Sequence, residues 1–170
     1  MQRSGVPPDS HTFPFVLKAC ASLGSSFLAR ALHCQALRFG FLVDVYVVNN
    51  LVHAYCLNGG VEYAFQVFDE SCYRDVVSYN VMIDGFVKAG ETGKARELFD
   101  EMPVRDTFSW GALIAGYAKM GQCRDAINLF DQMIDLNFLK PYAFLATGLV
   151  DMYAKCGCIE AAREVFEICS

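Results

Sequence analysis

Cysteine and histidine are the residue types in this sequence best suited to metal binding, nucleophilic catalysis and redox chemistry. The chain has eight cysteines and three histidines among 170 residues. The closest cysteines, Cys156 and Cys158, have one residue between them and no second Cys or His pair at zinc-finger spacing. A structural zinc ion needs four ligands at recognisable spacing, so we predict no metal site. Most cysteines lie in apolar helical patterns, which favours reduced, buried thiols over disulfides.

No combination of side chains in this sequence is typical of an enzyme. The chain lacks a His-x-Glu followed by Cys-x-x-Cys, the motif with which a zinc deaminase activates water. The three histidines recur at positions of a repeating pattern, and we expect them to pack rather than to catalyse: His11, His33 and His53. We therefore predict a protein with no catalytic centre and no bound cofactor.

Composition restricts the class of protein further. Hydrophobic residues make up 54% of the chain and charged residues 19%, which is typical of a chain that folds. The least charged window, residues 45–61, contains three asparagines, a histidine and two glycines, so we predict no membrane-spanning helix. The net charge of −5 argues against loose, charge-driven binding to nucleic acid, so any such recognition needs individually placed contacts.

The elements that would position such contacts are repeats. Glycines recur at intervals of 35, 31, 31 and 36 residues, at Gly24, Gly59, Gly90, Gly121 and Gly157. Apolar residues with helical spacing precede each glycine; an alanine follows five residues after it, and a His or Phe four residues later. Each unit is therefore predicted to be a helix, a turn and a second helix. Such hairpins bury their apolar faces only by stacking, which predicts an all-α solenoid.

The repeat motifs resemble those of the pentatricopeptide repeat family. Residues 76–90, VVSYNVMIDGFVKAG, are similar to the first helix of that motif, and residues 95–102, ARELFDEM, are similar to its second. The Trp and Leu-Gly of a tetratricopeptide first helix are absent. The resemblance covers essentially the whole chain and implies a right-handed superhelix of stacked helix-turn-helix repeats. The mixed unit lengths resemble the plant subclass that combines standard, longer and shorter motifs.

On this resemblance the chain is a single repeat array over residues 1–170. The predicted units are the tail of a preceding repeat at 1–9, a long-type repeat at 10–44, short-type repeats at 45–75 and 76–106, a standard-type repeat at 107–142 and a truncated repeat at 143–170. We expect a fragment that self-associates through its open ends. Because a standard unit is usually followed by a long one, we also expect a deleted repeat near residues 138–142.

Each repeat of this family faces one base of single-stranded RNA, so the resemblance implies an RNA-binding protein. The base is read by the fifth residue of the first helix together with the last residue of the same unit. In this sequence the pairs are Asn49 with Asp75 and Asn80 with Asp106, and Thr147 stands at the fifth position of the last unit. Asn followed by Asp resembles the combination associated with uracil, with cytosine second. An amide offers a donor and an acceptor to a pyrimidine edge, and a carboxylate can hold it in position.

Two further sets of positions are implied to contact RNA. Second-position side chains would stack on bases: Tyr46, Val77, Phe108 and Phe144. Lysines two residues before a glycine would face phosphates: Lys88, Lys119 and Lys155. Simpler interpretations stay open, in which the asparagines are exposed polar residues, the lysines are merely solvated, and the aspartates before each first helix are N-caps.

The resemblance also implies a role in organellar RNA processing, in a mitochondrion or chloroplast: recognition of C-to-U editing sites, splicing or RNA stability. The expected partners are single-stranded RNA, with pyrimidines favoured at units 45–75 and 76–106, and editing or processing proteins, but no membrane. Two alternatives stay open, a tetratricopeptide-like scaffold for protein–protein interaction and a non-functional fragment. The acidic balance favours the scaffold, whereas Asn and Asp at the reading positions favour RNA.

Overall fold

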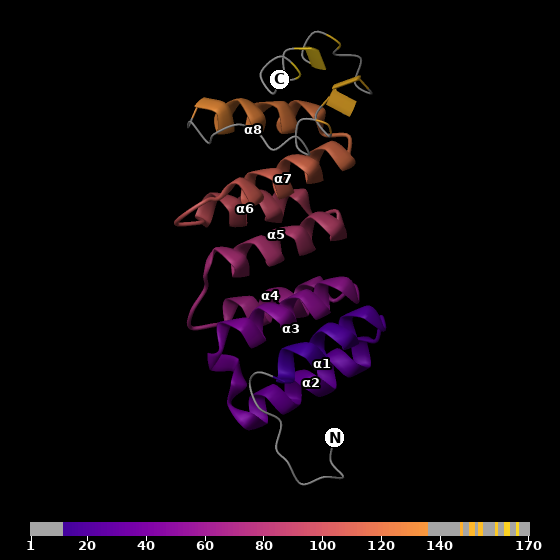
Figure 1. Cartoon of the computed structure of the whole chain (residues 1–170), viewed down its shortest axis with the longest axis vertical. Helices are drawn as coiled ribbons and strands as arrows, with labels where there is room; N and C mark the ends of the chain where they lie inside the picture. The colour runs from indigo at the N-terminus through magenta and orange to yellow at the C-terminus, as the bar shows by residue number, and fades with distance from the viewer. Residues whose placement is uncertain are drawn as a thin grey trace.

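Helical hairpins make up the part of the chain that the computed structural model describes, which is residues 12–135 together with residues 147, 150, 151, 153, 154, 159, 162, 163 and 166. The helices are α1 (Thr12–Ser22), α2 (Ser26–Phe39), the 3-10 helix η1 (Phe41–Val43), α3 (Val45–Leu57), α4 (Val61–Asp69), α5 (Val76–Ala89), α6 (Thr92–Glu101), α7 (Thr107–Lys119) and α8 (Cys123–Asp135). The hairpins are stacked along the long axis of the molecule (Figure 1). The prediction of an all-α solenoid is confirmed.

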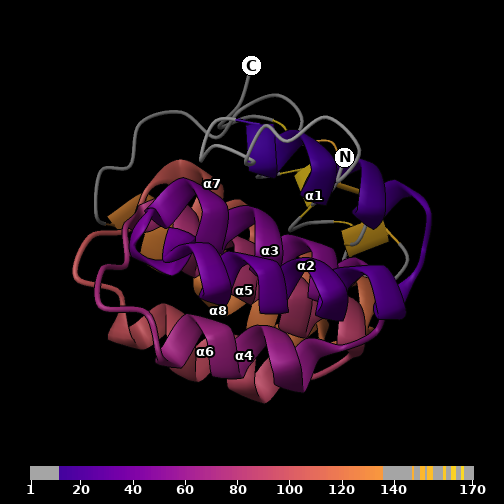
Figure 2. The ribbon, with the colours of Figure 1, turned by 90° about the horizontal axis from the view of Figure 1, so that it is seen from below.

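The first helices of the hairpins form one layer of the stack and the second helices form another. Each first helix contacts the first helix of the next hairpin, from α1 through α3 and α5 to α7. The second helices α4 and α6 each contact their own first helix and the first helix that follows. Figure 2 shows α4 and α6 together on one side of the stack, with α3 and α7 on the other. Equivalent residues of successive first helices therefore follow one another along a single layer.

The repeating glycines end the first helices, as the sequence predicts. Gly24, Gly59, Gly90 and Gly121 have φ values of 65°, 75°, 82° and 73°. These values lie in the left-handed region, which glycine enters without a steric cost and which commonly terminates a helix. Each turn leads into a second helix whose repeated alanine is fully buried: Ala29, Ala64, Ala95 and Ala126. The small side chain lets the two helices of a hairpin approach closely.

Two further glycines allow successive first helices to approach closely, and the sequence pattern did not indicate them. Gly85 on α5 and Gly116 on α7 occupy equivalent positions 31 residues apart. A Cβ atom at Gly85 would lie 2.3 Å from Cys56 Sγ on α3, and one at Gly116 would lie 2.6 Å from a methyl carbon of Val87 on α5. The spacing between repeats is therefore set in part by the absence of a side chain.

The cysteines follow the prediction of buried thiols only in part. Cys20 is buried, Cys56 is half-buried, and Cys34 and Cys72 are exposed free thiols. Burial raises the pKa of Cys56 to about 12. Cys123 is disulfide-bonded, so the expectation of reduced thiols is wrong for this residue.

Metal-binding clusters and membrane-spanning helices are both absent from the described residues. No group of three or more His, Cys, Asp or Glu side chains there is arranged to hold a metal ion. Among the same residues, no helix has both the length and the apolar character that a membrane span requires.

Candidate nucleic-acid interface

Two asparagine–aspartate pairs recur at equivalent places in successive hairpins. Asn49 on α3 donates a hydrogen bond from Nδ2 to Asp75 Oδ1 over 3.3 Å. One repeat later, Asn80 on α5 donates from Nδ2 to Asp106 Oδ1, also over 3.3 Å. Each asparagine lies on a first helix, and each aspartate directly precedes the first helix of the next hairpin. The fold therefore brings together the residues of each predicted reading pair.

The same aspartates cap the helices that follow them. Asp75 Oδ1 accepts hydrogen bonds from the Ser78 N–H and from the Ser78 hydroxyl, both over 2.8 Å. The Ser78 hydroxyl oxygen in turn accepts from the Asp75 N–H, which completes a capping box at the start of α5. Asp106 and Ser109 form the equivalent box at the start of α7. The N-cap interpretation is thus correct, and it coexists with a bond to the asparagine.

These hydrogen bonds also keep the two carboxylates ionised. Partial burial alone would raise the pKa of Asp75, but the hydrogen bonds from Ser78 and Asn49 outweigh it and lower the pKa. The pKa of Asp106 is likewise lowered, because bonds from Ser109 and Asn80 outweigh the effect of burial. At neutral pH each aspartate therefore carries a negative charge and can only accept hydrogen bonds.

The charge of each aspartate determines how its asparagine is oriented. Because a carboxylate has no hydrogen to donate, the nitrogen of the amide must face it and the carbonyl oxygen must point elsewhere. Oδ1 of Asn49 and Oδ1 of Asn80 are both buried and have no hydrogen-bond partner in the described structure. A buried, unpartnered acceptor costs about 1–3 kcal/mol and is uncommon in native proteins. Here the same atom is unpartnered in two successive repeats.

The asparagines are more buried than the sequence predicts, and the side chains beside them are exposed. Asn49 and Asn80 are only 7% and 6% exposed, so the interpretation of each as an exposed polar residue is wrong. In contrast, Tyr46 and Val77, three residues earlier on the same helices, are 60% and 54% exposed. Residues three apart lie on one face of a helix, so each amide is next to an exposed apolar side chain. Phe108 on α7 is 68% exposed.

The unit at 10–44 lacks a complete pair. Its fifth position is Pro14, which has no side-chain donor. Its last residue, Asp44, caps α3 by accepting from the Tyr46 N–H over 2.9 Å. This aspartate is therefore a helix cap without an asparagine partner.

The other predicted site residues differ in their exposure and in their contacts. Gly111, on α7, places no side chain at the fifth position of the unit at 107–142. Lys88 Nζ lies 2.6 Å from Asp84 Oδ2 one turn earlier on α5, so its charge is already paired. Lys119 is exposed in the last turn of α7, and Thr147 is an exposed helical residue. Phe144 and Lys155 lie outside the described residues.

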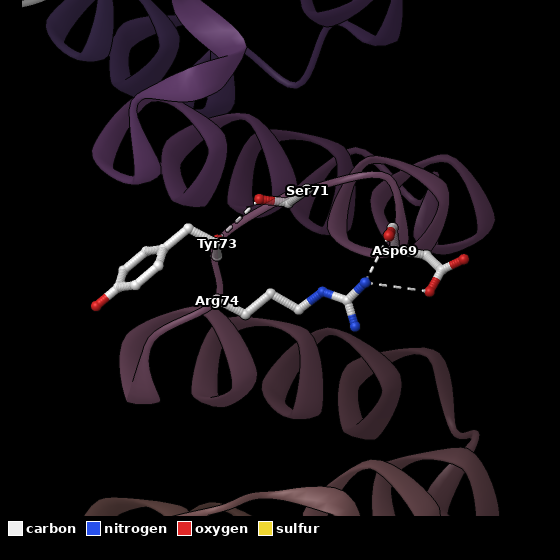
Figure 3. A network of polar contacts seen from close by, with 4 residues as sticks. All are labelled: Asp69, Ser71, Tyr73 and Arg74. Atoms are coloured by element: carbon white, nitrogen blue, oxygen red, sulfur yellow. Dashed lines mark hydrogen bonds and ion pairs between the residues drawn. The ribbon is translucent and has the colours of Figure 1, made fainter.

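Two arginines directly before the paired aspartates are functional candidates that the sequence did not single out. Arg74 reaches back to the end of α4, where Nη2 donates to the backbone carbonyl of Asp69 (Figure 3). Arg105 donates from Nε to the Phe99 carbonyl over 2.9 Å at the end of α6. The recurrence of Arg-Asp after 31 residues was the available signal.

Family models and relatives match this chain over most of its length. Models described as PPR repeat match residues 46–76, 71–103, 108–138 and 145–168. The pentatricopeptide repeat-containing protein At5g61800 of Arabidopsis thaliana is 58% identical over the whole chain, which covers 41% of that relative. Its alignment spans 207 positions against 170 residues here, an excess the size of one repeat. The chloroplastic/mitochondrial At1g59720 of the same plant is 47% identical over 52% of this chain and 14% of its own length. The chain thus spans less than half the length of these curated relatives.

Solved structures share the fold at lower identity. The pentatricopeptide repeat protein PPR10 in complex with an 18-nt psaJ RNA element superimposes with a TM-score of 0.82 and 24% identity over 96% of this chain and 25% of that one. The PPR domain of Arabidopsis thaliana protein-only RNase P 1, in complex with tRNA, gives a TM-score of 0.74 and 16% identity over 94% of this chain and 88% of that domain. At these identities, both matches show a shared fold of stacked helical hairpins.

Proposed function

Because the chain belongs to the pentatricopeptide repeat family, we propose that it binds single-stranded RNA, with one base read per repeat by Asn49 with Asp75 and by Asn80 with Asp106. Two proteins with the same fold are known in complex with RNA. The observation that carries the proposal is the unpartnered carbonyl oxygen of both amides. Because this oxygen is buried in the structure without RNA, a base would donate a hydrogen bond to it only once the amide turns outward.

The fixed orientation of the amide gives a reason for base preference. One N–H of each amide is bonded to a carboxylate, which leaves the second N–H and the carbonyl oxygen for a ligand. Uracil offers a donor at N3 and an acceptor at O4, which complement this acceptor and donor. Cytosine offers an acceptor at N3 and a donor at N4, so it fits the same geometry only if the amide is reversed. The pairs therefore favour uracil first and cytosine second.

Exposed side chains beside the amides supply stacking surfaces. We place the base read by Asn49 between Tyr46 and Val77, and the base read by Asn80 between Val77 and Phe108. Successive first helices are neighbours in one layer, so these second-position side chains follow one another along it. Stacking on an aromatic side chain contributes about 1–3 kcal/mol per base and tolerates any sequence. Stacking would thus supply affinity, while the amides would supply preference.

The affinity expected from two complete pairs is low. If each contributes about 1–3 kcal/mol, the gross gain is about 2–6 kcal/mol. Association costs at least about 4 kcal/mol in lost translational and rotational freedom. The chain should therefore bind a short RNA weakly, and nanomolar binding would contradict this estimate. High affinity would need more repeats than the two complete ones.

The proposed cellular role rests on the names of similar proteins. Two of them carry organellar names, chloroplastic/mitochondrial for At1g59720 and chloroplastic for At4g25270. We propose the same compartments here, with a role in RNA editing, splicing or stability and with processing proteins as partners. Family membership favours this function over the tetratricopeptide-like scaffold.

A pool of short RNAs randomised at every position tests the proposal. Asn80→Ala should abolish the base preference at one RNA position and leave the helical circular dichroism signal intact. Asn50→Ala is the matched control, because Asn50 is also an asparagine of a first helix but donates to the Tyr46 carbonyl of its own helix rather than to an aspartate. A base preference that survives Asn80→Ala unchanged would reject the reading role.

A further inference from the structure

The loop that precedes each paired aspartate is tied to the helix before it by an arginine. The last carbonyl groups of a helix have no partner within that helix. Arg105 supplies partners at the end of α6, donating to the Phe99 carbonyl over 2.9 Å and to the Asp100 carbonyl over 2.8 Å. Its guanidinium also lies 4.9 Å from the centre of the Phe99 ring, which is almost fully buried. These contacts leave residue 105 little freedom relative to α6.

Arg74 makes two of these three contacts one repeat earlier; its Nε, unlike that of Arg105, has no hydrogen-bond partner in the described structure. Nη2 donates to the Asp69 carbonyl and forms an ion pair with Asp69 Oδ1 over 3.4 Å, while the guanidinium lies 4.8 Å from the centre of the buried Phe68 ring. Figure 3 shows this side chain extending along the loop toward Asp69, with the Ser71 hydroxyl bonded to the Tyr73 carbonyl nearby. Through these contacts Arg74 ties the loop before Asp75 to the end of α4.

The unit at 10–44 has no arginine at this position, and it also lacks the serine at the third position of the following helix. Val43 occupies the equivalent position and is 86% exposed, and it has no side-chain donor. The following Asp44 has ψ 112°, whereas Asp75 and Asp106 have ψ 177° and 173°. Asp44 accepts a hydrogen bond from the N–H of the second residue of its helix. Asp75 and Asp106 instead accept from the N–H of the third residue of theirs. The backbone before the helix thus differs where the arginine is missing.

We propose that Arg74 and Arg105 are positioning residues, which hold Asp75 and Asp106 so that one carboxylate oxygen meets both the helix N-terminus and the asparagine amide. The arginines do not touch the base; they act through the aspartate that orients the amide. The consequence for RNA rests on the proposed function, but the consequence for the aspartate does not. This separation allows the two ideas to be tested independently.

The first test uses the protein without RNA. Arg105→Ala should raise the pKa of the Asp106 carboxyl toward its ordinary value, because the bonds from Ser109 and Asn80 weaken. An NMR titration of this carboxyl measures the change. The Ser109 amide should exchange with solvent about tenfold faster, the equivalent of one lost hydrogen bond. Arg105→Lys keeps the charge but has its donors on a single nitrogen, so it should give intermediate values and serves if the alanine variant fails to fold. Arg96→Ala is the control, because Arg96 pairs with the carboxylate of Asp100 within α6, whereas Arg105 binds the carbonyl of that residue from the loop.

The second test measures base preference. Arg105→Ala should reduce the discrimination at the base facing unit 76–106 by about three- to tenfold, close to the loss expected for one hydrogen bond. The preference at the neighbouring base should not change. If Asp106→Asn alters base preference while Arg105→Ala alters neither preference nor titration, the positioning role is overturned and RNA reading stands. If Arg105→Ala shifts the titration but Asp106→Asn leaves base preference unchanged, positioning of the acid is supported and the reading function fails.

Discussion

Replacing Gly116 by alanine should destabilise the stack of hairpins, although alanine is the better helix former. The new Cβ would lie 2.6 and 2.7 Å from the two methyl carbons of Val87 on α5. Valine is branched at Cβ and strongly prefers one rotamer in a helix, so it cannot swing both methyl groups away. The helices α5 and α7 would have to separate.

The magnitude follows from two opposing effects. Replacing glycine by alanine inside a helix stabilises it by about 1 kcal/mol. Forcing an extra carbon into a packed core costs about 1–3 kcal/mol, and two contacts below 3 Å favour the upper part of that range. We expect a net loss of about 1–2 kcal/mol in the free energy of unfolding. Gly93→Ala, at the second residue of α6, is the control, since nothing lies within 4 Å of its Cβ position, and it should stabilise by about 0.5 kcal/mol, the lower end of the range for a helix interior.

Urea unfolding followed by circular dichroism measures both variants. The two changes should move the unfolding midpoint in opposite directions. Adding Val87→Ala to Gly116→Ala should recover part of the loss, because it removes the methyl groups that meet the new Cβ, and a double-mutant cycle isolates that coupling. The reasoning is refuted if Gly116→Ala is as stable as Gly93→Ala, or if the cycle shows no coupling between the two positions.

Three other outcomes are expected. The lowered pKa values of Asp75 and Asp106 stabilise the folded state by an amount that is complete above about pH 4 and is lost as the pH falls through the native pKa values. The free energy of unfolding of Asp75→Asn should therefore depend less on pH in the acid range than that of the unaltered protein. Phe108→Ala should weaken RNA binding by about 1–3 kcal/mol with almost no change in unfolding midpoint, because this side chain is 68% exposed. Ser109→Ala should cost about 1 kcal/mol of stability by breaking the capping box at α7, measured by urea unfolding.

The helical framework was predictable because its signals are local and repeated. The spacing of Gly59, Gly90 and Gly121 predicts the turns, and the backbone at each has the positive φ that only glycine adopts easily. Asp75 and Asp106 were predicted as helix caps from their place before an apolar helical pattern, and both cap. The reading pairs came from family resemblance, since nothing in the spacing alone shows that residues 26 apart meet.

Features that depend on how one repeat packs against the next could not be predicted. The burial of Asn49 and Asn80, and the unpartnered oxygen of each, result from contacts between neighbouring hairpins. The close approach at Gly116 likewise depends on which residue of α5 faces it. A pattern of helical periodicity identifies a buried face but does not identify the partner on the neighbouring helix. The pairing of Lys88 with Asp84 is different, because it lies within one helix and its i, i+4 spacing is visible in the sequence.

Competition between two RNAs that differ only by uracil or cytosine at a single position tests the central claim most directly. Each position of a uridine-rich oligonucleotide is replaced in turn, and binding is compared for the unaltered protein and for Asp106→Asn. The asparagine variant no longer requires the Asn80 amide to face it with its nitrogen. We therefore predict that the unaltered protein prefers uracil at two positions and that Asp106→Asn loses the preference at one of them, while the position read by Asn49 with Asp75 keeps it. An unchanged preference for uracil at every position in Asp106→Asn would contradict the account.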